Sequence, residues 1–173
     1  MSPDWKVDAP RVLMLLTALA CIMPLTCRIA HAKAAPADPC SVLPATELNA
    51  VLGQQFGPPA KSLMPPGVAN GVTGSQCRYF ALGGSPRTVT LIIYFDPSDA
   101  DAETNLTQLS KLFHPIKTLT GFADIAYLDA SYAVHARQGR VRYYINITPI
   151  GTYTPEAEKN LTDLTAYVAA QVK

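Results

Sequence analysis

Apolar residues recur with a helical period in three segments of the chain, residues 43–56, 100–113 and 154–172. Either Ser98 or Asp99 can cap the second segment, and Thr154 starts the third; all three are residue types that cap helix N-termini. We therefore predict three helices that each turn one apolar stripe toward a core. The stripes comprise Leu43, Leu48, Val51, Leu52 and Phe56; Leu106, Leu109, Leu112 and Phe113; and Leu161, Leu164, Tyr167, Val168 and Val172.

Runs typical of strands lie between the first two helices. Residues 76–82 and 87–95 are separated by a Gly-Gly-Ser-Pro turn. Both faces of the second run are largely apolar, which predicts a central strand covered on both sides, with helices on at least one face. Residues 58–74 are rich in proline and glycine and predict a long loop, with residues 61–64 as an optional short strand.

A hairpin is predicted after residue 133, with Gln138 and Gly139 as a two-residue turn. In that register both strands have one apolar and one polar face. The predicted pairs are Arg137 with Arg140, Ala136 with Val141, His135 with Arg142, and Val134 with Tyr143. The polar face then carries His135, Arg137, Arg140, Arg142 and Tyr144.

The order of these elements predicts an α+β fold. We expect a mostly antiparallel sheet with helices packed on one face, in the order α-β-β-α-β-β-(β)-α, as a single domain over residues 40–173. The chain has 173 residues, of which 49% are hydrophobic, and this excludes a disordered chain. Its net charge of +1 gives no bulk attraction to nucleic acid or to an anionic membrane surface.

The N-terminus has the layout of a secretory signal peptide. An apolar run at residues 12–25 follows Lys6 and Arg11 and leads into two overlapping Ala-x-Ala cleavage sites at residues 30–34. We predict that residues 1–34 are removed, that residues 35–39 form a mobile lead-in, and that the exported protein, periplasmic or secreted, keeps no transmembrane segment. The alternative is a lipid anchor on Cys21, which would tether the same domain to a membrane.

Signal removal changes both the charge and the cysteine count. The remaining chain carries ten basic and eleven acidic residues, so its net charge is −1. Only Cys40 and Cys77 remain, and in an exported domain two cysteines most simply pair in a disulfide bond. The alternative is a redox or metal site, but the sequence has no Cys-x-x-Cys motif and no Cys/His ligand spacing. We predict no metal and no cofactor.

Several short motifs resemble the bacterial family called domain of unknown function 3558, whose members are short exported proteins and lipoproteins. The motifs are the Asp-Pro-Cys start with the residues after it at 38–53, the Gln-Cys-Arg-Tyr segment at 76–79, the Gly-Phe-Ala-Asp-Ile-Ala-Tyr segment at 121–127 and the final helix. Ala123 stands where the family has a second glycine. The resemblance implies an exported α+β domain with a Cys40–Cys77 bridge and carries over no catalytic residue.

The polar hairpin face is the one concentrated charge feature of the sequence. Like charges opposite each other on a sheet repel, so this face requires solvent, neighbouring carboxylates or an anionic ligand. In the first two cases the face is structural. In the third it binds an anionic component of the cell envelope or an acidic protein surface.

Three functional hypotheses follow from the sequence. The leading one is a non-enzymatic exported module that binds an envelope protein or an anionic ligand. The second is an uncharacterised hydrolase or transferase, which requires His114, Asp124 or His135 to converge in a pocket. We assign no catalytic residue, because the sequence has no known nucleophile or phosphate-loop motif. The third is a small-ligand carrier, which requires an apolar cavity between the sheet and the helices.

Overall fold

A computed structural model gives the fold and describes residues 38–64, 72, 74–149 and 153–172. The predicted signal peptide, Cys21 and residues 35–37 lie outside the described residues. The described helices are α1 (Pro39–Val42), α2 (Ala45–Leu52), α3 (Asp99–Phe113) and α4 (Pro155–Gln171). The strands are β1 (Ala60–Met64), β2 (Gly74–Phe80), β3 (Thr88–Phe95), β4 (Pro115–Leu119), β5 (Ile125–Asp129), β6 (Val134–Gln138) and β7 (Val141–Thr148).

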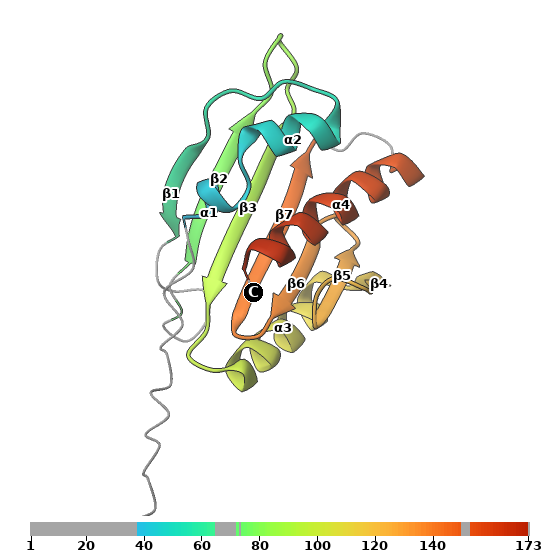
Figure 1. Cartoon of the computed structure of the whole chain (residues 1–173). Helices are drawn as coiled ribbons and strands as arrows, with labels where there is room; N and C mark the ends of the chain where they lie inside the picture. Colours follow the sequence, from blue (N-terminus) through green and yellow to red (C-terminus); the bar gives the residue numbers. More distant parts are fainter. Residues whose placement is uncertain (1–37, 65–71, 73, 150–152, 173) are drawn as a thin grey trace, which may run out of the picture. The chain divides into compact units, whose positions relative to one another are not determined.

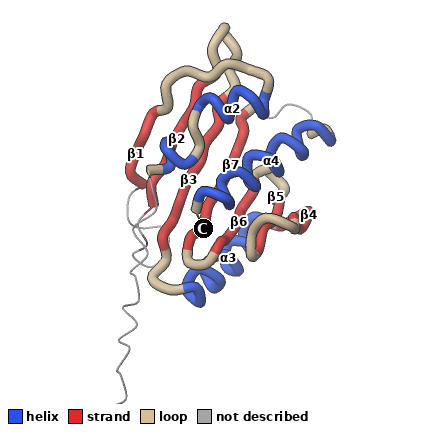
Figure 2. Tube along the Cα trace, in the orientation of Figure 1, coloured by secondary structure: helices blue, strands red, loops and turns tan. Residues whose placement is uncertain are grey.

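The strands form one seven-stranded sheet in the order β1-β2-β3-β7-β6-β5-β4, whose strands are coloured red in Figure 2. Every neighbouring pair is antiparallel. The sheet consists of two meanders, β1–β3 and β4–β7, which meet where β3 pairs with β7. The predicted α+β class with an antiparallel sheet is confirmed. The optional strand at residues 61–64 is present as β1, and the predicted central strand is β3, which pairs on both sides.

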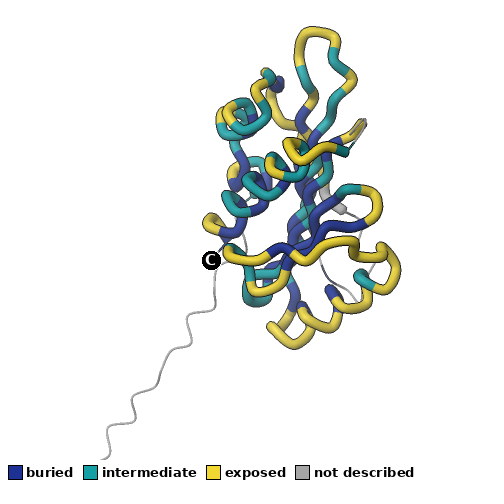
Figure 3. The backbone as a smooth tube through the Cα atoms, turned by 90° about the vertical axis from the view of Figure 1, so that its right-hand side faces the viewer, coloured by how far each residue is buried: buried dark blue, intermediate teal, exposed yellow. Residues whose placement is uncertain are grey.

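One face of the sheet carries the main core. Alternate residues of β3 and β7 point to this face, where Val89, Leu91 and Ile145 are fully buried. The last helix covers them with the predicted stripe, because Leu161, Leu164 and Val168 are also fully buried. Figure 1 shows α2 and α4 across this face, and Figure 3 shows the buried segments gathered inside the domain.

The third helix lies on the opposite face of the sheet, whereas the sequence predicted helices on one face (Figure 1). The physical reason is the topology, because α3 connects β3 to the far edge strand β4 and must cross β7, β6 and β5. Only the first half of its predicted stripe is tightly packed. Leu106 is buried, but Leu112 is 70% exposed and Phe113 is 42% exposed.

The β6–β7 hairpin forms in a different register from the predicted one. Its turn residues are Gly139 and Arg140, so Arg137 faces Arg142 and His135 faces Tyr144 across the two strands. Gly139 has a positive φ of 57°, which favours glycine at the first turn position. Each β6 residue pairs with a β7 residue two positions further along the chain than predicted. Because side chains alternate between the two faces of a strand, a shift of two leaves each residue on its predicted face. Arg140 moves from the strand into the turn.

The chain begins its fold earlier than predicted. Asp38 and Pro39, which the sequence placed in a mobile lead-in, belong to the domain, because the Asp38 carboxylate accepts from the Cys40 amide and Pro39 is buried in α1. The first predicted helix, residues 43–56, is shorter than expected, because α2 spans only Ala45–Leu52. The short helix α1 before it was not predicted, and the two are separated at Leu43, whose ψ of 91° is extended and which precedes Pro44. The caps at Ser98 and Thr154 are confirmed.

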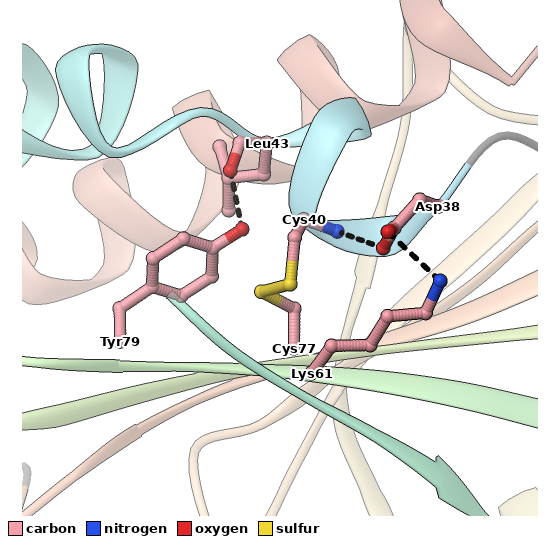
Figure 4. The surroundings of a disulfide bond; sticks show 6 residues. All are labelled: Asp38, Cys40, Leu43, Lys61, Cys77 and Tyr79. Carbon is pink, nitrogen blue, oxygen red and sulfur yellow. Dashed lines mark hydrogen bonds and ion pairs between the residues drawn. A yellow bond between two sulfur atoms is a disulfide. The ribbon is translucent and has the colours of Figure 1, made fainter. Parts of the chain in front are cut away.

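The predicted disulfide bond between Cys40 and Cys77 fastens α1 to β2 (Figure 4). The Tyr79 hydroxyl donates to the Leu43 carbonyl oxygen beside it, and Lys61 forms an ion pair with Asp38 at 2.8 Å. These contacts hold the start of the domain against the β1–β2 edge of the sheet. Within the described residues, no helix is long and apolar enough to cross a membrane.

We expect the loss of the disulfide to lower the free energy of unfolding substantially. The bond joins residues 37 positions apart, and the chain-entropy model gives about 4 kcal/mol for a loop of that length. Urea denaturation of the oxidised protein, the reduced protein and the Cys40→Ala/Cys77→Ala variant measures the effect. The reduced protein keeps both side chains and isolates the cross-link. Equal stability of the oxidised and reduced proteins would contradict the expectation.

Candidate functional site

The predicted polar hairpin face is mostly buried beneath α3. Arg142 is 3% exposed and forms a bidentate ion pair with Asp96, which is fully buried at the end of β3. Arg142 Nε donates to Asp96 Oδ2 at 2.6 Å, and Nη2 donates to Oδ1 at 3.1 Å. The Asn105 amide of α3 donates to the same Oδ1 at 2.6 Å. One carboxylate therefore joins β3, β7 and α3 and neutralises the most buried arginine.

The other two arginines also lie against neighbouring groups. Arg137 has a side chain only 12% exposed, and it lies 3.9 Å from a carboxylate oxygen of Glu103 and 3.9 Å from one of Asp124. The guanidinium carbon of Arg140 lies 3.9 Å from the centroid of the Phe95 ring. The arginines that the sequence placed side by side on an open strand face are thus divided between the buried side of the sheet and the turn.

His135 lies 4% exposed on the same face and is held by Asp129 of β5. Its Nε2 lies 2.8 Å from Asp129 Oδ2. The other carboxylate oxygen, Oδ1, accepts from the Ser131 amide, the Ser131 hydroxyl and the Ala133 amide. These hydrogen bonds make Asp129 a fixed acceptor. The Nε2 atom of His135 therefore has a hydrogen-bond partner. No described protein group forms a hydrogen bond with its Nδ1 atom.

Burial and the Asp129 carboxylate act on the protonation of this pair in opposite ways. Burial is the largest influence on His135 and lowers its pKa below the ordinary value, although Asp129 opposes the shift. Burial raises the pKa of Asp129, but the hydrogen bonds from Ser131, Ala133 and His135 outweigh it and leave that pKa lowered. The favoured state is therefore a neutral imidazole beside an ionised carboxylate.

Aromatic rings surround His135. The Tyr127 ring stacks on the imidazole with centroids 5.0 Å apart, the Phe113 ring lies at 5.0 Å, and the Tyr144 ring meets it edge-on at 4.9 Å. Burial raises the pKa of the Tyr127 phenol to about 12 and also raises that of Tyr144. All of these rings are therefore uncharged near neutral pH.

A cavity of about 230 Å³ lies between the second half of α3 and the sheet. Its lining is aromatic and aliphatic, and the lining side chains that carry polar groups are the imidazole of His135 and the phenols of Tyr94 and Tyr144. An apolar cavity of roughly 150 Å³ holds a benzene molecule, so this one accommodates one or two rings. The lining residues are Ile92, Tyr94, Leu109, Phe113, His135 and Tyr144.

Some of the polar groups beside the cavity already have hydrogen-bond or ion-pair partners within the protein. The Asn146 amide donates to the Tyr144 hydroxyl oxygen at 2.7 Å, so the Tyr144 O–H remains available as a donor. The guanidinium carbon of Arg142 lies 4.9 Å from the centroid of the Tyr94 ring. The charge of this arginine is neutralised by its ion pair with Asp96. The cavity thus combines an apolar wall, one imidazole and phenol groups, with its nearby charges already paired.

The residues proposed for catalysis are not joined to one another by any described hydrogen bond or ion pair. Asp124 accepts from the Gly139 amide at 2.7 Å and from Gln138 at 3.1 Å, so it ties the hairpin turn. His114 ends α3 with a positive φ of 51° and is exposed. His135 is held by Asp129. In the described part of the chain, no group of three or more His, Cys, Asp or Glu side chains is placed to hold a metal ion.

Sequence reasoning placed two of the six lining residues, His135 and Tyr144, on one polar face and missed the rest of the site. The role of Asp129 could have been predicted from residues 129–133, which read Asp-x-Ser-x-Ala. In turns of this kind an Asp side chain commonly accepts hydrogen bonds from nearby amides, as Asp129 does here. Nothing local indicated that Asp96 would reach Arg142, which lies 46 residues away.

Comparison with known proteins returned no match. No family model matches the chain, and no curated protein or solved structure shows significant similarity to it. The resemblance to domain of unknown function 3558 therefore stays a prediction.

We expect Asp96→Asn to destabilise the domain strongly. The substitution leaves Arg142 buried without a countercharge, and breaking a buried pair in this way costs about 3–5 kcal/mol. Urea denaturation measures the loss. Asp163→Asn is the matched control, because it breaks the exposed pair with Lys159, and such a pair contributes less than about 1 kcal/mol. Similar small losses in both variants would contradict the assignment of Asp96.

We expect the free energy of unfolding to fall as the pH drops below about 6.5, the ordinary pKa of histidine. The unfolded state then takes up a proton that the folded state resists, since the pKa of folded His135 is lowered. One such proton gives a slope of up to about 1.4 kcal/mol per pH unit. The groups facing His135 are Asp129 and Tyr127 from β5, Arg142 and Tyr144 from β7, and Phe113 from α3.

Denaturation series between pH 7.5 and 5 measure this slope. His135→Gln should flatten it, whereas His114→Gln, which replaces the exposed histidine at the end of α3, should leave it in place. An unchanged slope in His135→Gln would show that another group causes the pH dependence.

Proposed function

We propose that this protein is a non-enzymatic exported carrier that binds a small apolar ligand in the cavity between α3 and the sheet. The observation that carries the proposal is the cavity itself, with its aromatic wall and a volume of about 230 Å³. Ligand sites are concave and mostly apolar, with a few placed polar groups, and this cavity has that composition. Its volume lies below the ~300 Å³ at which sites for drug-sized molecules begin, so the ligand is small.

The architecture supports a ligand site at this place. The first half of α3 packs closely on the sheet through Ala102, Asn105 and Leu106, whereas the second half presents Leu109 and Phe113 over the space. Phe113 lines the cavity and is 42% exposed, so the cavity lies next to solvent at this residue. A ligand entering beside Phe113 would replace water around an apolar wall without disturbing the main core on the other face.

The binding of an anionic envelope component through the hairpin arginines receives less support. Arg142 has its charge satisfied by Asp96 away from solvent, and the Arg137 side chain is 12% exposed. A surface that attracts an anion requires accessible cations, and these two have little access.

Export to an oxidising compartment is part of the proposal. The Cys40–Cys77 bridge supports it, because disulfide bonds persist in the periplasm and outside the cell. The sequence of residues 1–34 supports it as a signal peptide, with lipid attachment at Cys21 as the alternative route to the same compartment. Membership of domain of unknown function 3558 would agree with both.

Binding of indene, a neutral two-ring hydrocarbon, tests the carrier function. We expect ligand-observed NMR to detect indene binding to the protein, and Leu109→Trp to abolish it, because the larger side chain fills the cavity. Leu112→Trp is the matched control, since it makes the same substitution three residues on at a position that is 70% exposed. Indene binding that survives Leu109→Trp, or the failure of both indene and its N–H analogue indole to bind, would overturn the proposed site.

A further inference from the structure

The buried imidazole in the cavity wall has one nitrogen held and one available. Asp129 Oδ2 lies 2.8 Å from His135 Nε2, and a carboxylate can only accept there, so this nitrogen carries the hydrogen. In a neutral imidazole the other nitrogen, Nδ1, is then an acceptor. None of the protein groups that the structure describes donates a hydrogen bond to it. His135 is 4% exposed and lines the cavity, so a ligand seated there is placed to supply the donor.

From this geometry we infer that the cavity selects a neutral aromatic molecule bearing one N–H or O–H group, and that this group donates a hydrogen bond to His135 Nδ1. The inference rests on the proposed function and names its ligand class. Asp129 is the positioning residue, since it fixes which nitrogen accepts and is itself fixed by Ser131 and Ala133. A buried acceptor discriminates strongly, because a ligand without the donor leaves it unpaired.

The aromatic wall explains why a ring is preferred to an aliphatic chain. Rings attract one another in edge-on and offset arrangements beyond the effect of buried area. The aromatic side chains of Tyr94, Phe113 and Tyr144 all line the space. A planar ligand can therefore pack against one ring face while its polar edge turns toward the imidazole.

The charges near the cavity favour a neutral ligand. The charged groups nearest the cavity are Arg142, which contacts the Tyr94 ring, and Asp129, which is paired with His135. Asp96 and the hydrogen bonds around Asp129 satisfy these charges within the protein, and no counterion is required from the ligand.

Indole and indene test the inference, because they have the same shape and differ by an N–H group in place of a methylene group. We expect the protein to bind indole about tenfold more tightly than indene in titrations followed by NMR, the ratio that one buried hydrogen bond supplies. His135→Phe keeps a ring in place and should remove the preference while indene still binds. His114→Phe, the same substitution at the exposed histidine, should retain it.

The unmodified protein provides a second measurement that does not depend on a variant folding. In ¹⁵N spectra of the histidine side chains, free His135 should show a protonated Nε2 and an unprotonated Nδ1. Indole should move the Nδ1 resonance upfield, and indene should leave it in place. A protonated Nδ1 in the free protein, or equal affinity for the two probes, would overturn the inference. Equal affinity would leave the carrier function standing, whereas failure of both probes to bind would overturn the carrier function as well.

Discussion

The buried carboxylate of Asp96 determines how the second face of the sheet is closed. It lies fully buried at the end of β3, accepts from Arg142 of β7 through two hydrogen bonds and from Asn105 of α3 through a third. Each of these charges would be very costly alone in the interior, so the three elements must meet at this point. The start of α3 is thereby fixed over β7, and the rest of the helix extends toward the far edge of the sheet.

The cavity follows from this attachment. Because α3 is fastened near its N-terminal end, its small and polar residues there allow close contact, whereas its last turn carries Phe113 and ends at an exposed His114. The rings of Phe113, Tyr127 and Tyr144 surround His135 under that half of the helix. The resulting space has the buried Asp129–His135 pair in its wall, where both hydrogen-bond geometry and burial favour a neutral imidazole.

Much of the fold could be predicted because its signals are local. Period-two and period-3.6 patterns indicated the strands and helices, and capping residues such as Ser98 and Thr154 marked where helices begin. The hairpin was placed correctly but its turn was misplaced, since Gly139 fits either position of a two-residue turn. Its faces were still correct, because a shift of two leaves the alternation of side chains unchanged.

The sequence by itself indicated the helices α2, α3 and α4, the strands β2, β3, β6 and β7, and the single disulfide once residues 1–34 were set aside. It also indicated the side of the strands on which His135, Arg137, Arg142 and Tyr144 lie. Only the tertiary structure decided that this side is covered by α3, because helix placement depends on a crossover to the far edge strand and not on local pattern. It also decided that Arg142 is neutralised by Asp96 and His135 is held by Asp129. A sequence gives the number of charges, whereas their effect depends on distances and burial that exist only after folding.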